Sequence, residues 1–198
     1  MALVYRAVSG ALVAVLAAAT VEAGQDAVTR GVTEWSASAS VARGIDLLQS
    51  NGGQRYAMPT FSWGRVLTDL RGPALLRGRF EWAVEVTPIF AEWSSGHARG
   101  VGVAPLQWRW NLAPRGRVHP FAEVGGGALW TTTPIPAGTT GSNFMTHGGV
   151  GLRVLSGRGR GLIAGYRLHH ISNGNRLRRN PGVNAHMLTV GYTRIARP

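Results

Sequence analysis

The sequence contains no cysteine, no lysine and few acidic residues. The absence of cysteine excludes a disulfide framework and a metal site built from thiolates. Because lysine is absent, all 21 basic residues are arginines; nine residues are acidic, and the formal net charge is +12. A soluble chain this basic would suggest nucleic acid as a partner. An exported chain would instead meet the phosphate groups of lipids or glycolipids, which suit the planar fork of arginine, so we expect such a lipid and no nucleic acid.

The first 23 residues have the pattern of a secretory signal peptide. Arg6 supplies a positive charge, residues 11–20 form an apolar stretch, and residues 21–23 (VEA) resemble an A-x-A cleavage site. The apolar stretch falls well short of the roughly 20 residues that a transmembrane helix needs. We therefore expect cleavage near Ala23 and export of residues 24–198, which are enough for one domain.

Helical periodicity is also missing after the signal. Glycine is frequent, with 28 residues, and apolar residues recur at the spacing of two that is typical of strands. In residues 79–93, one face carries Phe80, Trp82 and Val84, and the other carries Glu81 and Glu85. Turn-rich stretches separate similar segments, and together they predict eight strands near residues 31–43, 55–67, 79–93, 100–112, 118–132, 144–155, 160–172 and 184–195.

Eight alternating strands fit two architectures. One is a soluble, lipocalin-like barrel or sandwich with apolar side chains inside, and the other is a membrane barrel with apolar side chains facing lipid. The segments are long enough to cross a membrane at a tilt, the chain carries an export signal, and tryptophans cluster toward segment ends, as in interfacial girdles. We therefore predict an all-β, eight-stranded antiparallel up-and-down transmembrane β-barrel in the cell outer membrane.

A polar cluster interrupts the apolar face of the seventh predicted strand. Alternation places His170 and Ser172 on the face of Leu168, which would look into lipid, and places Asn184 of the eighth strand on the same wall, with His186 as a further candidate. Polar side chains that face lipid carry a high free-energy cost, and a functional role is one good reason for their presence there. The loop between these strands would lie on the cell exterior, and its arginines are suited to binding lipid phosphates: Arg176, Arg178 and Arg179.

The opposite face of these strands is expected to be structural. His169 would point into the barrel together with Arg167, as a hydrogen-bonded interior side chain. Glu81 and Glu85 would balance interior arginines, namely Arg109, Arg153 and Arg167. No pair of histidines has a carboxylate at metal-ligand spacing, so the sequence indicates neither a metal nor another cofactor.

His170 and Ser172 lie two residues apart on one strand face, so the imidazole can reach the hydroxyl, as a base and a serine nucleophile require. Asn173 and Asn180, with loop amides freed by Gly174 and Gly182, can offer donors to an oxyanion. Taken alone, H-x-S is a weak signal, because most such pairs at a strand end are incidental.

Over about 25 residues the sequence resembles the lipid A 3-O-deacylase family (PagL), whose pattern of H-x-S-N followed by an asparagine and a glycine corresponds here to His170, Ser172, Asn173, Asn180 and Gly182. The resemblance implies an outer-membrane barrel that removes an ester-linked acyl chain from lipid A without a metal. It implies that Ser172 is the nucleophile and His170 the general base, with Asn173 and Asn180 or nearby amides as oxyanion donors.

The position of the family's acidic triad member, fourteen residues after the histidine, is Asn184 here, and no acidic residue follows Glu123. An asparagine can orient a histidine, but it cannot stabilise the imidazolium by charge. A noncatalytic outer-membrane barrel that binds lipopolysaccharide or stabilises the envelope therefore remains an alternative, as does, more weakly, a soluble periplasmic lipid carrier. The sequence also leaves a homodimer open.

Overall fold

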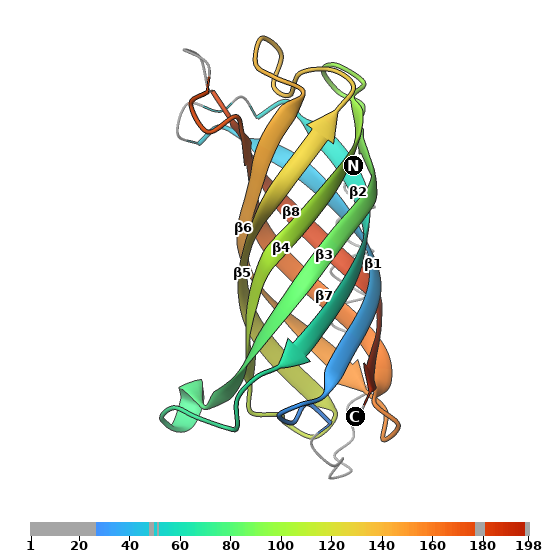
Figure 1. The fold of residues 1–198 in the computed structure, drawn as a ribbon, viewed down its shortest axis with the longest axis vertical. Helices are drawn as coiled ribbons and strands as arrows, with labels where there is room; N and C mark the ends of the chain where they lie inside the picture. The colour runs from blue at the N-terminus through green and yellow to red at the C-terminus, as the bar shows by residue number, and fades with distance from the viewer. Residues whose placement is uncertain (1–26, 48–49, 51, 177–180, 197–198) are drawn as a thin grey trace, which may run out of the picture.

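A computed structural model describes residues 27–47, 50, 52–176 and 181–196, so the predicted signal peptide lies outside the described residues. Eight antiparallel strands pair in chain order, and β8 pairs with β1 to close the barrel (Figure 1). The strands are β1 (Thr33–Ile45), β2 (Arg55–Val66), β3 (Gly78–Glu92), β4 (Arg99–Leu112), β5 (Val118–Thr131), β6 (Ser142–Leu155), β7 (Arg160–Ser172) and β8 (Val183–Ala196). The predicted fold class and all eight strands are confirmed, with shifts of up to two residues at strand ends.

The two ends of the barrel differ in what connects the strands. The loops β1–β2, β3–β4, β5–β6 and β7–β8 lie at one end, the top in Figure 1. The other end carries the remaining three connections, including the short 3₁₀ helix η1 (Ala74–Leu76), together with both ends of the described chain. We call these the loop end and the terminal end.

The outward face of the barrel wall is apolar, and the inward face is polar. In β3, Glu81, Glu85 and Thr87 are buried inside, whereas Val86 is 46% exposed on the outside. Large exposed apolar side chains recur around the wall, for example Phe61, Val124 and Leu162. At about 3.3 Å per residue, strands of 12–15 residues are long enough to cross a bilayer at a tilt. This pattern is that of a membrane barrel, because a soluble barrel would place its apolar side chains inside. Among the described residues, no helix is long and apolar enough to span a membrane.

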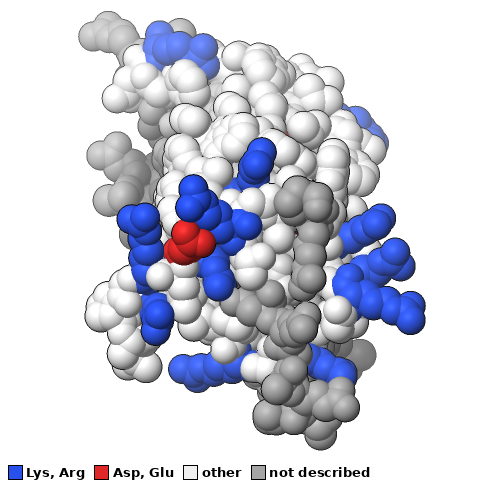
Figure 2. All heavy atoms as spheres, turned by 60° about the horizontal axis from the view of Figure 1, so that its bottom comes forward, with Lys and Arg blue, Asp and Glu red and all other residues white. Residues whose placement is uncertain are grey.

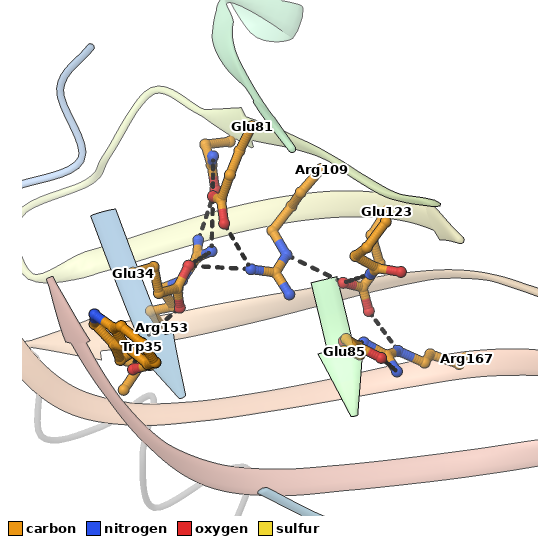
Figure 3. A network of polar contacts seen from close by, with 11 residues as sticks. Glu34, Trp35, Glu81, Glu85, Arg109, Glu123, Arg153 and Arg167 are labelled. Atoms are coloured by element: carbon orange, nitrogen blue, oxygen red, sulfur yellow. Dashed lines mark hydrogen bonds and ion pairs between the residues drawn. The ribbon is translucent and has the colours of Figure 1, made fainter. Parts of the chain in front are cut away.

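A network of ion pairs fills the middle of the barrel (Figure 3). Arg109 contacts Glu34, Glu81 and Glu123 at 3.0–3.1 Å. Arg153 pairs with Glu34 and Glu81, and Arg167 binds Glu85 at 2.7 Å and Glu123 at 2.6 Å. The predicted balance between interior glutamates and the three arginines is therefore confirmed.

The space left beside this network is small. A cavity of about 20 Å³ next to Glu85, Arg109 and Arg167 has room for about one water molecule. Farther toward the loop end, Tyr56 donates or accepts a 2.7 Å hydrogen bond with His169 Nδ1, and both side chains are buried. His169 is thus a hydrogen-bonded interior side chain, as its position on the strand predicts.

Candidate active site

The candidate site lies on the outer wall of the barrel, where β7 and β8 reach the loop end. In β7, Leu168, His170 and Ser172 face outward, whereas Arg167, His169 and Ile171 are buried inside. His170 pairs in register with Asn184 of β8 on one side and with Thr146 of β6 on the other. The register therefore places His170 and Asn184 side by side on the outward face.

The imidazole of His170 is held by a two-step hydrogen-bond chain. Its Nδ1 lies 2.7 Å from Asn184 Oδ1, and Asn184 Nδ2 donates a 2.7 Å hydrogen bond to the carbonyl oxygen of Leu47 in the β1–β2 loop. Because a carbonyl can only accept, the amide of Asn184 must turn its NH₂ toward Leu47 and its oxygen toward His170. The oxygen can only accept as well, so His170 carries its proton on Nδ1 and keeps the lone pair of Nε2.

Gly182 packs directly against the same imidazole. A Cβ atom at this position would lie 2.9 Å from His170 Cε1, closer than a side-chain carbon normally approaches. The φ angle of Gly182 is +63°, a region that other residues adopt at a cost. Both facts favour glycine here, so the end of the β7–β8 loop helps to hold the ring in place.

Ser172 ends β7 next to an apolar side chain. It pairs with Phe144 of β6, which is 48% exposed on the outer wall, while Ser172 itself is half-buried. Ser172 and His170 are both described residues, and no hydrogen bond joins the Ser172 hydroxyl to the His170 ring. Their common face brings the two side chains to the same patch, and catalytic hydrogen bonds are often long before substrate binds.

The chain turns sharply directly after Ser172. Gly174 and Asn175 have positive φ angles of 65° and 59°, and Gly174 lies against Phe144, since a Cβ atom there would approach the ring to 2.8 Å. This turn keeps the backbone of the loop close to the outer wall, beside Ser172.

Asn173 follows the last residue of β7, and its side chain is fully buried. This burial fits the alternation along the strand, which turns Ser172 outward and the next residue inward. The role of the Asn173 amide as an oxyanion donor stays a prediction. The backbone carbonyl of Asn173 accepts a 2.9 Å hydrogen bond from Arg176 Nε.

Arg176 folds back over the outer wall. Its guanidinium lies 4.9 Å from the centre of the Phe144 ring and donates to the Ser142 carbonyl at 2.5 Å. Since Phe144 is the register partner of Ser172, this places the exposed Arg176 near the proposed nucleophile. Arg178, Arg179 and Asn180 lie outside the described residues.

His186 belongs to a separate polar pair on the same wall. It lies opposite Leu168 in register, and its Nδ1 is 2.5 Å from the hydroxyl of Tyr166. The sequence indicated His186 as a candidate neighbour of Ser172, but the structure joins it to Tyr166. Tyr166 itself lies opposite Leu188, so the contact with His186 is diagonal and can be found only once the register is known.

Among the described residues, no acidic side chain forms a hydrogen bond or ion pair with His170 in place of the missing carboxylate. Glu123 points into the barrel and binds Arg109 and Arg167, and Glu92 accepts hydrogen bonds from Ser94, Ser95 and Gly96 in the β3–β4 loop. Within the described ranges, no group of three or more histidine, cysteine or acidic residues is arranged to hold a metal ion.

An apolar wall around a sealed, charged interior, with a histidine and a serine on its outer surface, defines a membrane β-barrel with a candidate hydrolase site. The family model described as lipid A 3-O-deacylase (PagL) matches residues 53–193. The chain belongs to this family, and the match contains every described residue of the site except Leu47.

Two solved structures are similar to the chain. One, described as the outer membrane enzyme PagL, is 19% identical with a TM-score of 0.49, and the alignment covers 81% of this chain and 99% of that one. The other, the outer membrane protein OprG from Pseudomonas aeruginosa, is 9% identical with a TM-score of 0.48 and covers 86% of this chain and 98% of that one. No curated protein matches the sequence.

Proposed function

We propose that the protein is an outer-membrane esterase that removes an ester-linked acyl chain from lipid A, as a 3-O-deacylase, with Ser172 as nucleophile and His170 as general base. Asn184 orients the histidine. Family membership supports the substrate class, and the arrangement of His170 and Asn184 supports the mechanism.

The observation that carries the proposal is the orientation of the Asn184 amide. An asparagine in place of a triad acid lowers the rate about 10⁴-fold where it stabilises the wrong histidine tautomer. Here the Leu47 carbonyl fixes the amide the other way round, so Asn184 Oδ1 accepts from Nδ1 of His170. The basic Nε2 is thereby the nitrogen available to the serine.

The proposed reaction has two halves. Nε2 of His170 takes the proton of Ser172 Oγ as this oxygen attacks the acyl carbonyl, and the protonated imidazole then gives its proton to the departing sugar hydroxyl. Water hydrolyses the acyl-enzyme by the same proton transfers in the second half. We propose that backbone N–H groups of the turn that begins at Gly174 stabilise the oxyanion, with Asn180 as a further donor.

The surroundings of Ser172 suit a lipid with an anionic head group. Leu168 and Phe144 are exposed on the wall next to the site and offer contact to an acyl chain. Arg176 lies over Phe144, where its planar fork can bind a phosphate; Arg178 and Arg179 of the same loop are proposed to do the same. With the termini in the periplasm, the loop end lies at the outer leaflet, where lipopolysaccharide is found.

The neutral Asn184 limits the rate. It fixes the ring, but it cannot stabilise the imidazolium that forms in the transition state as a carboxylate would. We therefore expect a slow enzyme whose rate rises in Asn184→Asp. The carboxylate loses the hydrogen bond that Asn184 donates to the Leu47 carbonyl, but it gains a charged hydrogen bond to the imidazolium. Hydrogen bonds to charged groups contribute about 1.5–3 kcal/mol, compared with about 1 kcal/mol for neutral ones.

The test is to refold residues 24–198 in detergent with purified lipid A and to follow released fatty acid by mass spectrometry. We expect release by the parent chain, a loss on the order of 10³-fold or more in Ser172→Ala, and faster release in Asn184→Asp. Release that is equal in the parent and in Ser172→Ala would reject the serine mechanism.

The asparagine at position 184 also favours a second candidate function, a barrel that binds lipopolysaccharide without cleaving it. If neither the parent nor Asn184→Asp releases fatty acid, while both bind lipid A, the result would favour that function. Activity in Asn184→Asp alone would indicate a site that keeps its geometry but lacks the charge that the reaction needs.

A further inference from the structure

Exposed arginines gather at the terminal end of the barrel, away from the proposed active site. Figure 2 shows this end turned toward the viewer, with basic side chains spread across it. Within the described part of the chain, the only exposed acidic residue there is Asp69, which pairs with Arg30. The exposed arginines at this end are Arg30, Arg65, Arg71, Arg77, Arg115, Arg117, Arg158, Arg160 and Arg194.

Two of these arginines face each other across neighbouring strands. Arg160 at the start of β7 pairs in register with Arg194 near the end of β8, and both are exposed on the outward face. Like charges directly opposite each other destabilise a sheet. Neither side chain makes a hydrogen bond or ion pair to any described residue, so within the described part of the chain nothing compensates this repulsion.

A pocket lies at the same place. It has a volume of about 410 Å³ and is lined by Arg158, Arg160 and Arg194, with Gly157, Gly159 and Ile195 among its other residues. Among the described residues, its lining contains three arginines and no acidic side chain. This volume lies within the range of about 300–1,000 Å³ that is typical of small-molecule sites.

The pocket adjoins the apolar wall at the depth of the aromatic girdle. Arg194 is the register partner of Trp35 in β1, which is 58% exposed, and the next outward pair along β7 and β8 is Leu162 with Tyr192, at 57% and 49% exposure. Tryptophan and tyrosine at such positions mark the boundary between hydrocarbon and head groups. A phosphate at the two arginines would therefore have its acyl chains against Leu162 and Tyr192.

From the facing arginines, the basic pocket and the adjoining apolar wall, we infer that the terminal end binds an anionic phospholipid of the periplasmic leaflet, with its phosphate between Arg160 and Arg194. This inference rests on the membrane orientation that we propose, and it is independent of the esterase reaction. The occupant is a lipid and not a free anion, because the apolar contacts continue up the wall from the phosphate position.

The test is native mass spectrometry of residues 24–198 in detergent, titrated with phosphatidylglycerol or with phosphatidylethanolamine of the same acyl chains. We expect preferential binding of phosphatidylglycerol. Arg160→Gln/Arg194→Gln is expected to bind on the order of 100-fold more weakly, because it removes two guanidinium groups that would form charge-assisted hydrogen bonds with the phosphate. Inorganic phosphate in excess is expected to leave the lipid bound.

The matched control is Arg71→Gln/Arg115→Gln, which removes the same charge from exposed positions at the same end, outside the pocket, and is expected to bind like the parent. Equal losses in both variants would overturn the inference in favour of a diffuse charge effect. Unchanged binding in Arg160→Gln/Arg194→Gln, equal binding of the two lipids, or displacement by phosphate would overturn it as well.

Folding of each variant is checked by its mobility in unheated detergent gels. Arg160→Lys/Arg194→Lys keeps both charges and is expected to lose only part of the affinity, because lysine lacks the bidentate fork.

Lipid A hydrolysis is measured on the same samples. Lipid binding in a chain without esterase activity would support this inference while counting against the proposed reaction.

Discussion

The interior of the barrel and the outer wall at the loop end differ in the polar partners that their side chains use. Inside, three arginines and four glutamates are buried and form short, charged hydrogen bonds, as between Arg167 and Glu85. On the wall, His170, Asn184 and the Leu47 carbonyl form a chain whose two acceptors are uncharged. The carboxylates of the strands are therefore buried inside the barrel, whereas the proposed site on the outer wall uses the uncharged oxygens of an amide and a backbone carbonyl.

The largest effect is expected from breaking the interior network. Arg153→Met leaves Glu34 and Glu81 with one arginine fewer, and breaking one partner of a buried ion pair typically costs about 3–5 kcal/mol. Urea unfolding in lipid vesicles, followed by tryptophan fluorescence, measures the loss. Arg115→Met, at an exposed position, is the control, with an expected change within about 0.5 kcal/mol. Similar small losses in both variants would contradict the structural role of the network.

The next effect concerns the orientation of His170. Asn184→Leu removes both hydrogen bonds of the amide, and we expect about a fivefold or greater loss in hydrolysis, since one neutral hydrogen bond contributes about 1 kcal/mol. The free energy of unfolding is expected to change much less than in Arg153→Met, because the position is on the surface. Wild-type hydrolysis by this variant would show that the histidine does not depend on Asn184.

Gly182→Ala should disturb the same ring from the other side. The added Cβ approaches His170 Cε1 to 2.9 Å, and a left-handed backbone costs a non-glycine residue about 1–2 kcal/mol, so we expect severalfold slower hydrolysis with a small loss of stability. Gly138→Ala is the matched control, because the φ angle of Gly138 is +80° and the added atom meets nothing within 4 Å. If the two variants behave alike, the packing of Gly182 on His170 has no role in the reaction.

The smallest effect is expected from the second polar pair on the wall. Tyr166→Phe removes the hydroxyl that contacts His186 but keeps the ring, and because this pair has no contact with Ser172 we expect hydrolysis within about twofold and stability within about 0.5 kcal/mol. Fatty acid release and urea unfolding measure both. A large loss of hydrolysis would extend the site down the wall and weaken the contrast between the two pairs.

Alternation predicted most of the fold and the faces of the site. A spacing of two places His170 outward and His169 inward regardless of the remainder of the chain. The same rule, applied beyond Ser172, places the side chain of Asn173 inward, and this side chain is fully buried.

Other features required the three-dimensional structure. Leu47 lies 137 residues before Asn184 in an irregular loop, and no sequence pattern indicates which carbonyl such a loop presents. The arginines of the terminal end were visible as basic turns between predicted strands, but the pocket among them depends on the exact register of β7 with β8, which periodicity alone does not fix.

The contact between Asn184 and Leu47 links the proposed site to the closure of the barrel. It joins the last strand to the loop after the first strand, across the seam where β8 meets β1. A chain that is still inserting has not yet closed this seam, so its histidine lacks the contact that sets its tautomer. The orientation of the proposed base therefore depends on the closure of the barrel and not on β7 and β8 alone.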